Sequence, residues 1–411
     1  MPSSFTWLDY SEFERQRMLN VIELFGDRST VDELGLGTVR DVFADKLFPG
    51  TSTIQTRAKY FLFVPWVYLT FERKRTSSQK FKKRSRKLEI KLIYSLLESD
   101  DLSGLIGRQS KENLQRHASG VYWQGLHRWG IRKFDGSEPE YRRSLDSFYA
   151  RYRGYKDMND EFEGETRADS MPCNWDTSLP PIPPEFPNDQ SLRLDREQAH
   201  YLSEQIITNC PDSMLAFLIG RGESVAKINW AWDYKDQANE KLRKILIDAQ
   251  NFSEVIHGAQ LLYNLMLSEL TKSQDHIDGY RNLLGDWWES ISQRRTEIES
   301  WNVDAFWKFV QTENPRLSLR AKKFIDEWIG LSRGAKNISF LDNAHTRNLL
   351  ERREVQLKRS LARLTNDRAL EIWSGRAGAN QLDLRWRSAR TILTDILIGL
   401  GVGEAEVAGN A

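Results

Sequence analysis

The sequence contains few of the residues that build disulfide-rich or metal-dependent domains. Its 411 residues include two cysteines, Cys173 and Cys210, and six histidines. Two cysteines exclude a framework of several disulfide bonds and the metal modules that require three or four thiolates. No two histidines have the spacing of a metal site on a helix, so we expect neither a metal ion nor another cofactor.

Segments for membrane insertion or export are also missing. No apolar run approaches the roughly 18 residues that a membrane-spanning helix needs. The opening residues MPSSFTWLDY lack the basic and apolar regions of a signal peptide. We therefore expect a cytoplasmic protein with no membrane partner.

Helical periodicity, in contrast, is present along nearly the whole chain. Residues 60–69 are apolar on all sides, which predicts a helix buried in the centre of a domain. Neither an alternation of strand and helix patterns nor an internal repeat is found. The predicted fold class is therefore mainly α, with two helical lobes. Amphipathic helices are expected at residues 9–25, 38–48, 252–270 and 381–400.

A change of composition near the middle of the chain predicts the domain limits. Residues 157–190 lack periodicity, and six acidic residues from Asp157 to Asp169 are followed by clustered prolines. Such a segment is typical of a linker or of an extended loop lying over a surface. The expected parts are a basic helical domain at 1–156, an acidic and proline-rich linker at 157–190, an acidic Trp-rich helical domain at 191–400 and a flexible tail at 401–411.

The charge is distributed unevenly, although the net charge is only +1. Residues 57–156 hold 23 basic and 10 acidic side chains, a local net charge of +13. Nine cations fall within the 15 residues from Arg73 to Lys87. This density predicts contact with nucleic-acid phosphates, and a solvated helix face neutralised by the acidic half of the chain is the alternative. The expected phosphate contacts are Arg73, Lys74, Arg75, Lys80, Lys82, Lys83, Arg84 and Arg86.

Arg57 and Lys59 stand just before the apolar run of residues 60–69. A cation at this position either contacts phosphate or pairs with an acidic neighbour such as Asp45. We expect the structural pairing.

Residues 111–131 have the pattern of a helix–turn–helix or winged-helix-like unit. Residues 111–116 form a short expected helix, 117–120 a turn and 121–129 a second helix. The second helix places Tyr122, Leu126 and Trp129 at i, i+4 and i+7, so these side chains should pack inward. An ordinary helical hairpin is the alternative. The residues expected to face outward, near the bases, are Trp123, Gln124, His127 and Arg128.

A second candidate site combines a polar stripe with a glycine-rich segment. His257, Gln260 and Asn264 lie on an otherwise apolar helix, where they either satisfy one another and a facing element or line a pocket. Residues 374–380 precede a helix and either bind an anion at its start or form a tight turn. The expected pocket residues are His257, Asn264, Arg376 and Asp383.

Known catalytic patterns do not fit the sequence. Glu89-Ile90-Lys91 matches half of a nuclease signature, but it lies in a helical pattern without a preceding strand-borne aspartate, so chance explains it. Ser224 in Gly220–Ser224 lacks the second glycine of a nucleophile elbow. No catalytic residues are expected.

Several stretches together resemble a known family. They are residues 56–66, with TRAKYFLFVPW, residues 121–126, with VYWQGL, the segments 257–267 and 373–375, and residues 382–386, with LDLRW. The chain resembles the uncharacterised bacterial domain-of-unknown-function family numbered 6361, from about Phe5 to Leu400. The resemblance implies no established activity, cofactor or catalytic residue. The occurrence of such proteins near helicase and phospholipase-D-like genes of anti-phage islands would suit a nucleic-acid accessory role.

These observations favour a non-enzymatic nucleic-acid-binding or adaptor protein, with DNA as the expected ligand, in a defence or mobile-element system. A second hypothesis is a scaffold whose acidic lobe docks a helicase or nuclease through exposed Trp287, Trp288 or Trp301. A third is an enzyme with an unfamiliar site around the pocket residues named above.

Overall fold

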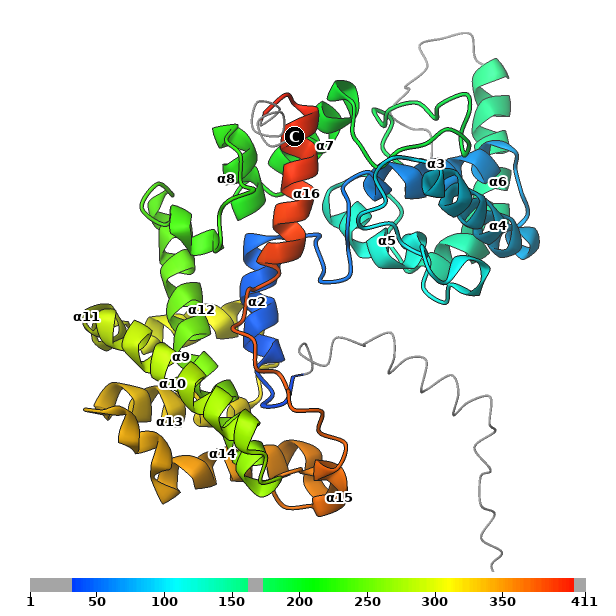
Figure 1. The fold of residues 1–411 in the computed structure, drawn as a ribbon. Helices are drawn as coiled ribbons and strands as arrows, with labels where there is room; N and C mark the ends of the chain where they lie inside the picture. Colours follow the sequence, from blue (N-terminus) through cyan, green and yellow to red (C-terminus); the bar gives the residue numbers. More distant parts are fainter. Residues whose placement is uncertain (1–31, 162–172, 403–411) are drawn as a thin grey trace, which may run out of the picture. The chain divides into compact units, whose positions relative to one another are not determined.

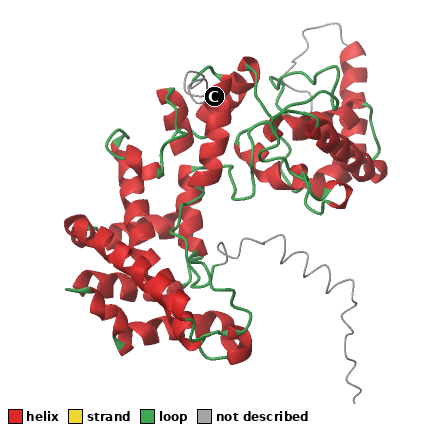
Figure 2. Cartoon of the chain, viewed as in Figure 1, coloured by secondary structure: helices red, strands yellow, loops and turns green. Residues whose placement is uncertain are grey.

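The computed structural model describes residues 32–161 and 173–402, and this part of the chain is mainly α (Figure 1). It contains fifteen α-helices, connected by short 3-10 turns and loops. No strand is present in these two ranges, where a single isolated bridge joins Arg132 to Trp175 (Figure 2). The predicted fold class is confirmed. The helix expected at residues 9–25 lies outside the described residues.

The chain forms two compact units, and each is assembled from two separate stretches. The first combines residues up to Val42 with Ile247–Leu382, and the second combines Phe43–Leu246 with residues from Asp383 onward. The domain limits expected at residues 156 and 190 both lie within the second unit and stay predictions. Composition changes along the sequence, whereas compact units depend on which stretches pack together.

The second unit surrounds one apolar helix. This helix, α3, packs on α4 and α5, while α4 also contacts α6. Elsewhere in the unit, α16 lies against α7 and α8 (Figure 1). The helices of this unit are α3 Tyr60–Arg73, α4 Ser78–Leu97, α5 Ala118–Arg128, α6 Glu138–Glu161, α7 Arg196–Asn209, α8 Met214–Arg221 and α16 Trp386–Gly399, with 3-10 turns η2 Lys111–Asn113 and η4 Ala231–Tyr234. Helix α2, Gly37–Leu47, crosses the limit between the units.

Helix α3 forms the core of the second unit, as its sequence predicts. Every residue from Tyr60 to Tyr68 is buried. Tyr68 is surrounded by aromatic rings of α4, α5 and α6, with centroid distances of 5.3–5.5 Å. The loop that follows α6 also reaches this core, because the indole of Trp66 donates a hydrogen bond of 2.9 Å to the carbonyl of Pro180. The described part of the expected linker therefore packs against α3.

Arg57 forms ion pairs within the protein, as expected, but its partners differ from the expected Asp45. Its guanidinium lies 2.9 Å from Asp395 and 2.5 Å from Asp101, and both ion pairs are largely buried. Asp45 pairs instead with Arg385. Lys59 is buried as well, and its ammonium donates to the side-chain amide of Gln198 rather than to a carboxylate.

The first unit surrounds helix α9, Glu240–Leu270, which begins in the second unit. No residue from Ala249 to Ser268 is exposed, so this stretch is covered on all sides. Its neighbours in the chain are α10 Gln274–Gln293, α11 Arg295–Ser300, α12 Val303–Glu313, α13 Leu319–Gly334, α14 Ala344–Lys358 and α15 Asp367–Leu370, with 3-10 turns η5 Ile338–Asp342 and η6 Arg359–Leu361.

The tryptophans expected to anchor a partner are mostly part of this core. Trp287 and Trp301 are only 5% and 6% exposed, so the expectation of exposed anchors is wrong for both. The indole of Trp287 lies directly on Gly258 and donates to the carbonyl of Glu254 at 2.8 Å. The indole of Trp301 donates to Asp248 at 2.6 Å. Trp288 is half-buried beside Phe340.

Candidate functional sites

The cations expected to contact phosphate are all exposed. They lie at the end of α3, in the turn that follows and along α4. Lys87 and Lys91 continue the same solvent-facing side of α4. We call these side chains the basic surface. It consists of Arg73, Lys74, Arg75, Lys80, Lys82, Lys83, Arg84, Arg86, Lys87 and Lys91.

The spacing of charges on α4 differs from that on other helices. Four like-charged i, i+4 pairs occur between Lys80 and Lys91, and such pairs destabilise a helix by a few tenths of a kcal/mol each. Elsewhere cations on helices pair with acids at the same spacing, as Lys322 does with Asp326. Among the side chains that the structure describes, those of residues 32–153 and 173–402, no member of the basic surface forms an ion pair. The like charges of the basic surface therefore have no direct ionic partner among these side chains.

The opposite side of α4 is anchored to α5 through a buried carboxylate. Glu89 accepts hydrogen bonds from the backbone amide of Ser119 at 3.0 Å and from its hydroxyl at 2.9 Å. Ser119 lies in the first turn of α5, so Glu89 satisfies an amide that has no partner within the helix. The nuclease-like match at Glu89 is thus a structural contact between two helices.

The environment of Glu89 predicts a pH dependence of stability. Burial raises its pKa to about 7, against the hydrogen bonds from Ser119, with smaller effects of Glu138 and Arg86. Because the folded-state pKa exceeds the unfolded value, the stabilising contribution is complete below about pH 4.5 and is lost as the pH rises through 7. His117, whose ring lies 4.0 Å away, has a pKa lowered to about 4 by burial, then by Arg86, and contributes the opposite slope.

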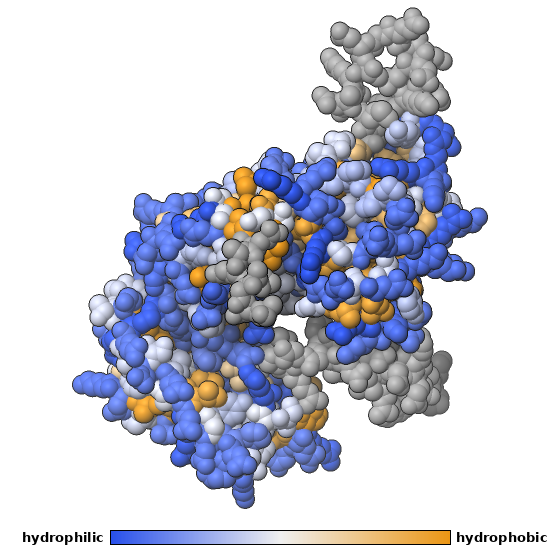
Figure 3. All heavy atoms as spheres, turned by 45° about the horizontal axis from the view of Figure 1, so that its top comes forward, coloured by the Kyte–Doolittle hydropathy of each residue, from blue (hydrophilic) through white to orange (hydrophobic). Residues whose placement is uncertain are grey.

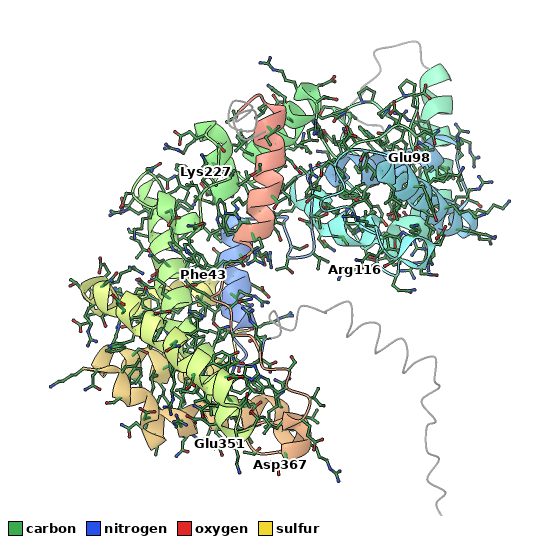
Figure 4. The ribbon with its side chains drawn as sticks, viewed as in Figure 1. Phe43, Glu98, Arg116, Lys227, Glu351 and Asp367 are labelled. Carbon is green, nitrogen blue, oxygen red and sulfur yellow. The ribbon has the colours of Figure 1, made fainter. Side chains whose placement is uncertain are left out.

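We expect Glu89→Gln to remove this slope, because the amide still accepts from Ser119 but carries no charge. When the pH is raised from 5 to 8, the unfolding free energy of the variant should therefore increase by about 1–3 kcal/mol relative to that of the wild type. Urea titrations at both pH values test this, since His117 is common to both proteins. Glu98→Gln, at the exposed end of α4 (Figure 4), is the control. Parallel pH profiles for wild type and Glu89→Gln would contradict the interpretation.

The expected base-reading face of α5 is only partly exposed. Gln124, His127 and Arg128 face solvent, as expected. Trp123 is 3% exposed, so its expected outward position is wrong. Its ring packs 5.5 Å from that of Tyr141 in α6, and its indole donates to the carbonyl of Gly136 at 2.9 Å.

A helix–turn–helix unit is not confirmed in this region. The first of its two expected helices is reduced to the 3-10 turn η2 of three residues. Since no strand is present among the described residues, a winged-helix arrangement is not confirmed either. Residues 117–120 contribute mainly to the N-terminal turn of α5.

A pocket of about 570 Å³ lies within the first unit, between α9, α10 and the glycine-rich segment. It includes two of the four residues expected there, His257 and Arg376. Asn264 is fully buried behind it, and Asp383 instead accepts from the backbone amide of Arg387 at 3.3 Å at the start of α16. The lining residues are His257, Leu261, Asp275, His276, Gly279, Tyr280, Leu283, Ser374, Gly375, Arg376, Ala379, Asn380 and Gln381.

The polar stripe of α9 holds the glycine-rich segment in place. His257, Gln260 and Asn264 contact the carbonyl oxygens of Ala379, Gly378 and Ala377 at 3.1, 2.8 and 2.7 Å. Asn264 also accepts from the amide of Ala377 at 2.8 Å. The stripe therefore satisfies the backbone of a distant loop, and His257 lines the pocket as well.

Sequence reasoning missed the contribution of α10. Asp275, His276, Gly279 and Tyr280 follow the i, i+3, i+4 spacing of one helix face, which was a usable signal. Their partner loop lies about a hundred residues away in the sequence. Gly375 is required there, because its φ is +87° and a side chain would meet the ring of His276.

Two further properties of the described residues concern membrane-spanning helices and clusters of metal-binding side chains. Within residues 32–161 and 173–402, none of the helices combines the length and apolar character needed to cross a bilayer. In the same ranges, no three His, Cys, Asp or Glu side chains gather so that they would hold a metal ion.

Hydrophilic side chains dominate the visible face of the molecule, with hydrophobic residues in smaller patches (Figure 3).

Comparison with known proteins agrees with the resemblance found in the sequence. No curated protein and no solved structure gives a significant match to this chain. A family model matches residues 2–398, which is nearly the entire sequence. The chain therefore belongs to a family of unknown function, DUF6361.

Proposed function

We propose that the chain binds nucleic acid, with DNA as the principal ligand, and that the basic surface contacts the phosphate backbone. The observation that carries this proposal is the exposure of ten cations between Arg73 and Lys91 that form no ion pair with any side chain that the structure describes. Phosphate contacts supply most of the affinity of non-specific binding and require no enzymatic chemistry.

The helical placement of these cations supports the proposal. Lys80, Lys83, Lys87 and Lys91 recur at three- or four-residue spacing, so their side chains project from one side of α4. Their mutual repulsion costs stability in the free protein, and a polyanion would remove it. Tyr94, 40% exposed at the end of the same helix, lies under the ammonium of Lys111 at 5.9 Å. An exposed ring beside cations is suited to stacking on an unpaired base.

We expect binding that weakens steeply with salt. If about five cations each neutralise one phosphate, affinity should fall about 500-fold between about 50 and about 200 mM salt. Fluorescence anisotropy with a mixed-sequence DNA duplex, the matching single strand and RNA measures both the slope and the preferred ligand. No binding at the lower salt, or binding that salt does not weaken, would overturn the proposal.

An accessory role in an anti-phage or mobile-element system is part of the same proposal and rests on the family resemblance. The alternative of a scaffold for a helicase or nuclease has lost its main support, because Trp287 and Trp301 are buried. The enzyme alternative retains the pocket as its possible location, with His257 and Arg376 but not Asp383 among the lining residues.

A further inference from the structure

The pocket of the first unit has an apolar wall, in which Leu261 and Tyr280 are only 1% and 6% exposed and Leu283 is open to solvent. Leu261 of α9 and Tyr280 and Leu283 of α10 contribute this wall. Leu283 is 46% exposed. Gly279 stands on the same face of α10, and a Cβ added to it would meet no atom within 4 Å. The absence of a side chain at Gly279 leaves a flat, open area on which a planar ring fits.

Arg376 provides a positive charge at the same pocket. Its guanidinium donates to the side-chain oxygen of Asn380, which is a neutral partner. No ion pair of Arg376 occurs among the described residues, so its charge is available to a ligand. Guanidinium groups bind phosphate and carboxylate through paired hydrogen bonds. The hydrogen bonds from α9 fix the backbone of the loop that carries Arg376.

Hydrogen-bond acceptors complete the lining. His257 contacts a carbonyl oxygen through Nε2, so this nitrogen must donate, and Nδ1 is left as an acceptor. Burial lowers the pKa of His257, partly offset by that hydrogen bond, and therefore favours the neutral ring. Asp275 lines the pocket and is exposed, and its carboxylate makes no hydrogen bond or ion pair within the described ranges. An ionised carboxylate is an acceptor only, and it can accept hydrogen bonds from the hydroxyl groups of a sugar.

We propose that this pocket binds a mononucleotide, with the base on the apolar wall, the phosphate at Arg376 and the ribose hydroxyls at Asp275. A volume of about 570 Å³ lies within the range of roughly 300–1,000 Å³ that is typical for ligands of this size. An inorganic anion or a free amino acid would leave the open area at Gly279 and Leu283 in contact with water. A nucleotide uses the ring surface, the cation and the acceptors together.

Isothermal titration calorimetry of the full chain tests this with adenosine 5′-monophosphate as the probe. Adenosine and inorganic phosphate are titrated separately, and guanosine and cytidine monophosphates report base preference. We expect saturable binding of a nucleotide, weakening by about tenfold or more for adenosine, and no measurable heat for phosphate. Failure of all three nucleotides to bind would overturn the proposal.

Two matched pairs of variants test where the ligand lies in the pocket. Gly279→Leu fills the open face and should abolish binding, whereas Gly285→Leu, a helix-interior glycine of α10 with equally open surroundings, should leave binding unchanged. Circular dichroism checks that both variants fold. Arg376→Ala should weaken binding about tenfold or more, whereas Arg376→Lys should restore part of it. Full binding by folded Gly279→Leu, or by Arg376→Ala if Gly279→Leu does not fold, would overturn the assignment.

The test is independent of DNA binding. Nucleotides are anions and can also occupy the basic surface, so the titration is repeated with that surface reversed in charge. Pocket binding should persist in such a variant, because all lining residues belong to the first unit. Loss of nucleotide binding there would assign the nucleotide to the basic surface and overturn the pocket proposal.

Discussion

Reversing three charges on α4, as Lys80→Glu/Lys83→Glu/Lys87→Glu, should reduce DNA affinity by roughly 100-fold or more at about 100 mM salt. Each substitution removes a phosphate contact and adds repulsion, and the three side chains share one face of the helix. The salt dependence should also become shallower. If each lysine neutralises one phosphate, the slope of the logarithm of the binding constant against the logarithm of the salt concentration should decrease in magnitude by about 2.7. Fluorescence anisotropy with the mixed-sequence duplex measures both quantities.

The control for this variant changes the same total charge at another place. Lys308, Arg316 and Lys336 are exposed in the first unit, and each makes no ion pair with a described residue. Their replacement by glutamate should change affinity by less than about threefold. Equal losses in the two triple variants would mean that only net charge matters, and the assignment of the basic surface would be wrong.

Removing the carboxylate of Asp395 should destabilise the second unit by about 3–5 kcal/mol. Asp395 accepts from Arg57 at 2.9 Å and from the backbone amide of Ala58 at 2.8 Å. Asp395→Ala would leave the Arg57 guanidinium, which is largely buried, with Asp101 and the carbonyl of Ser103 as its remaining partners. Urea unfolding followed by tryptophan fluorescence measures the loss.

An exposed ion pair of the same unit is the matched control. Asp212 lies 2.5 Å from the ammonium of Lys241, and both side chains are more than half exposed. Asp212→Ala should cost much less stability than Asp395→Ala, because solvent screens this pair. If Asp395→Ala cost no more than Asp212→Ala, the buried pair would not be an important connection between α16 and the start of α3.

Much of the secondary structure follows from local pattern. Helix α2 lies within one residue of its predicted limits at both ends. The buried part of α3 is Tyr60–Tyr68, which is all but the last residue of the unbroken apolar run of residues 60–69. Exposure of the basic segment is equally predictable, because a row of Lys and Arg side chains has no low-energy position inside a protein. The polar stripe of α9 indicates either buried hydrogen bonds or a pocket lining, but the pattern does not specify the partners.

Tertiary structure decided whether individual aromatic side chains are buried or exposed. Trp123 lies next to Tyr122 on α5, at the edge of the buried face, and periodicity alone gives it no fixed environment. It is buried because α6 and the loop carrying Trp175 pack over it. Trp287 is buried for a comparable reason, since Gly258 on α9 leaves room for its indole.

The sequence by itself determined the helical class, the central position of α3 and the location of the basic segment, because each depends on neighbours within a few residues. Only the tertiary structure decided that Arg57 pairs with Asp395 and that α10 faces the glycine-rich segment across a pocket. Those contacts join residues about one hundred to more than three hundred positions apart. Their formation depends on how helices pack, which periodicity along one helix does not specify.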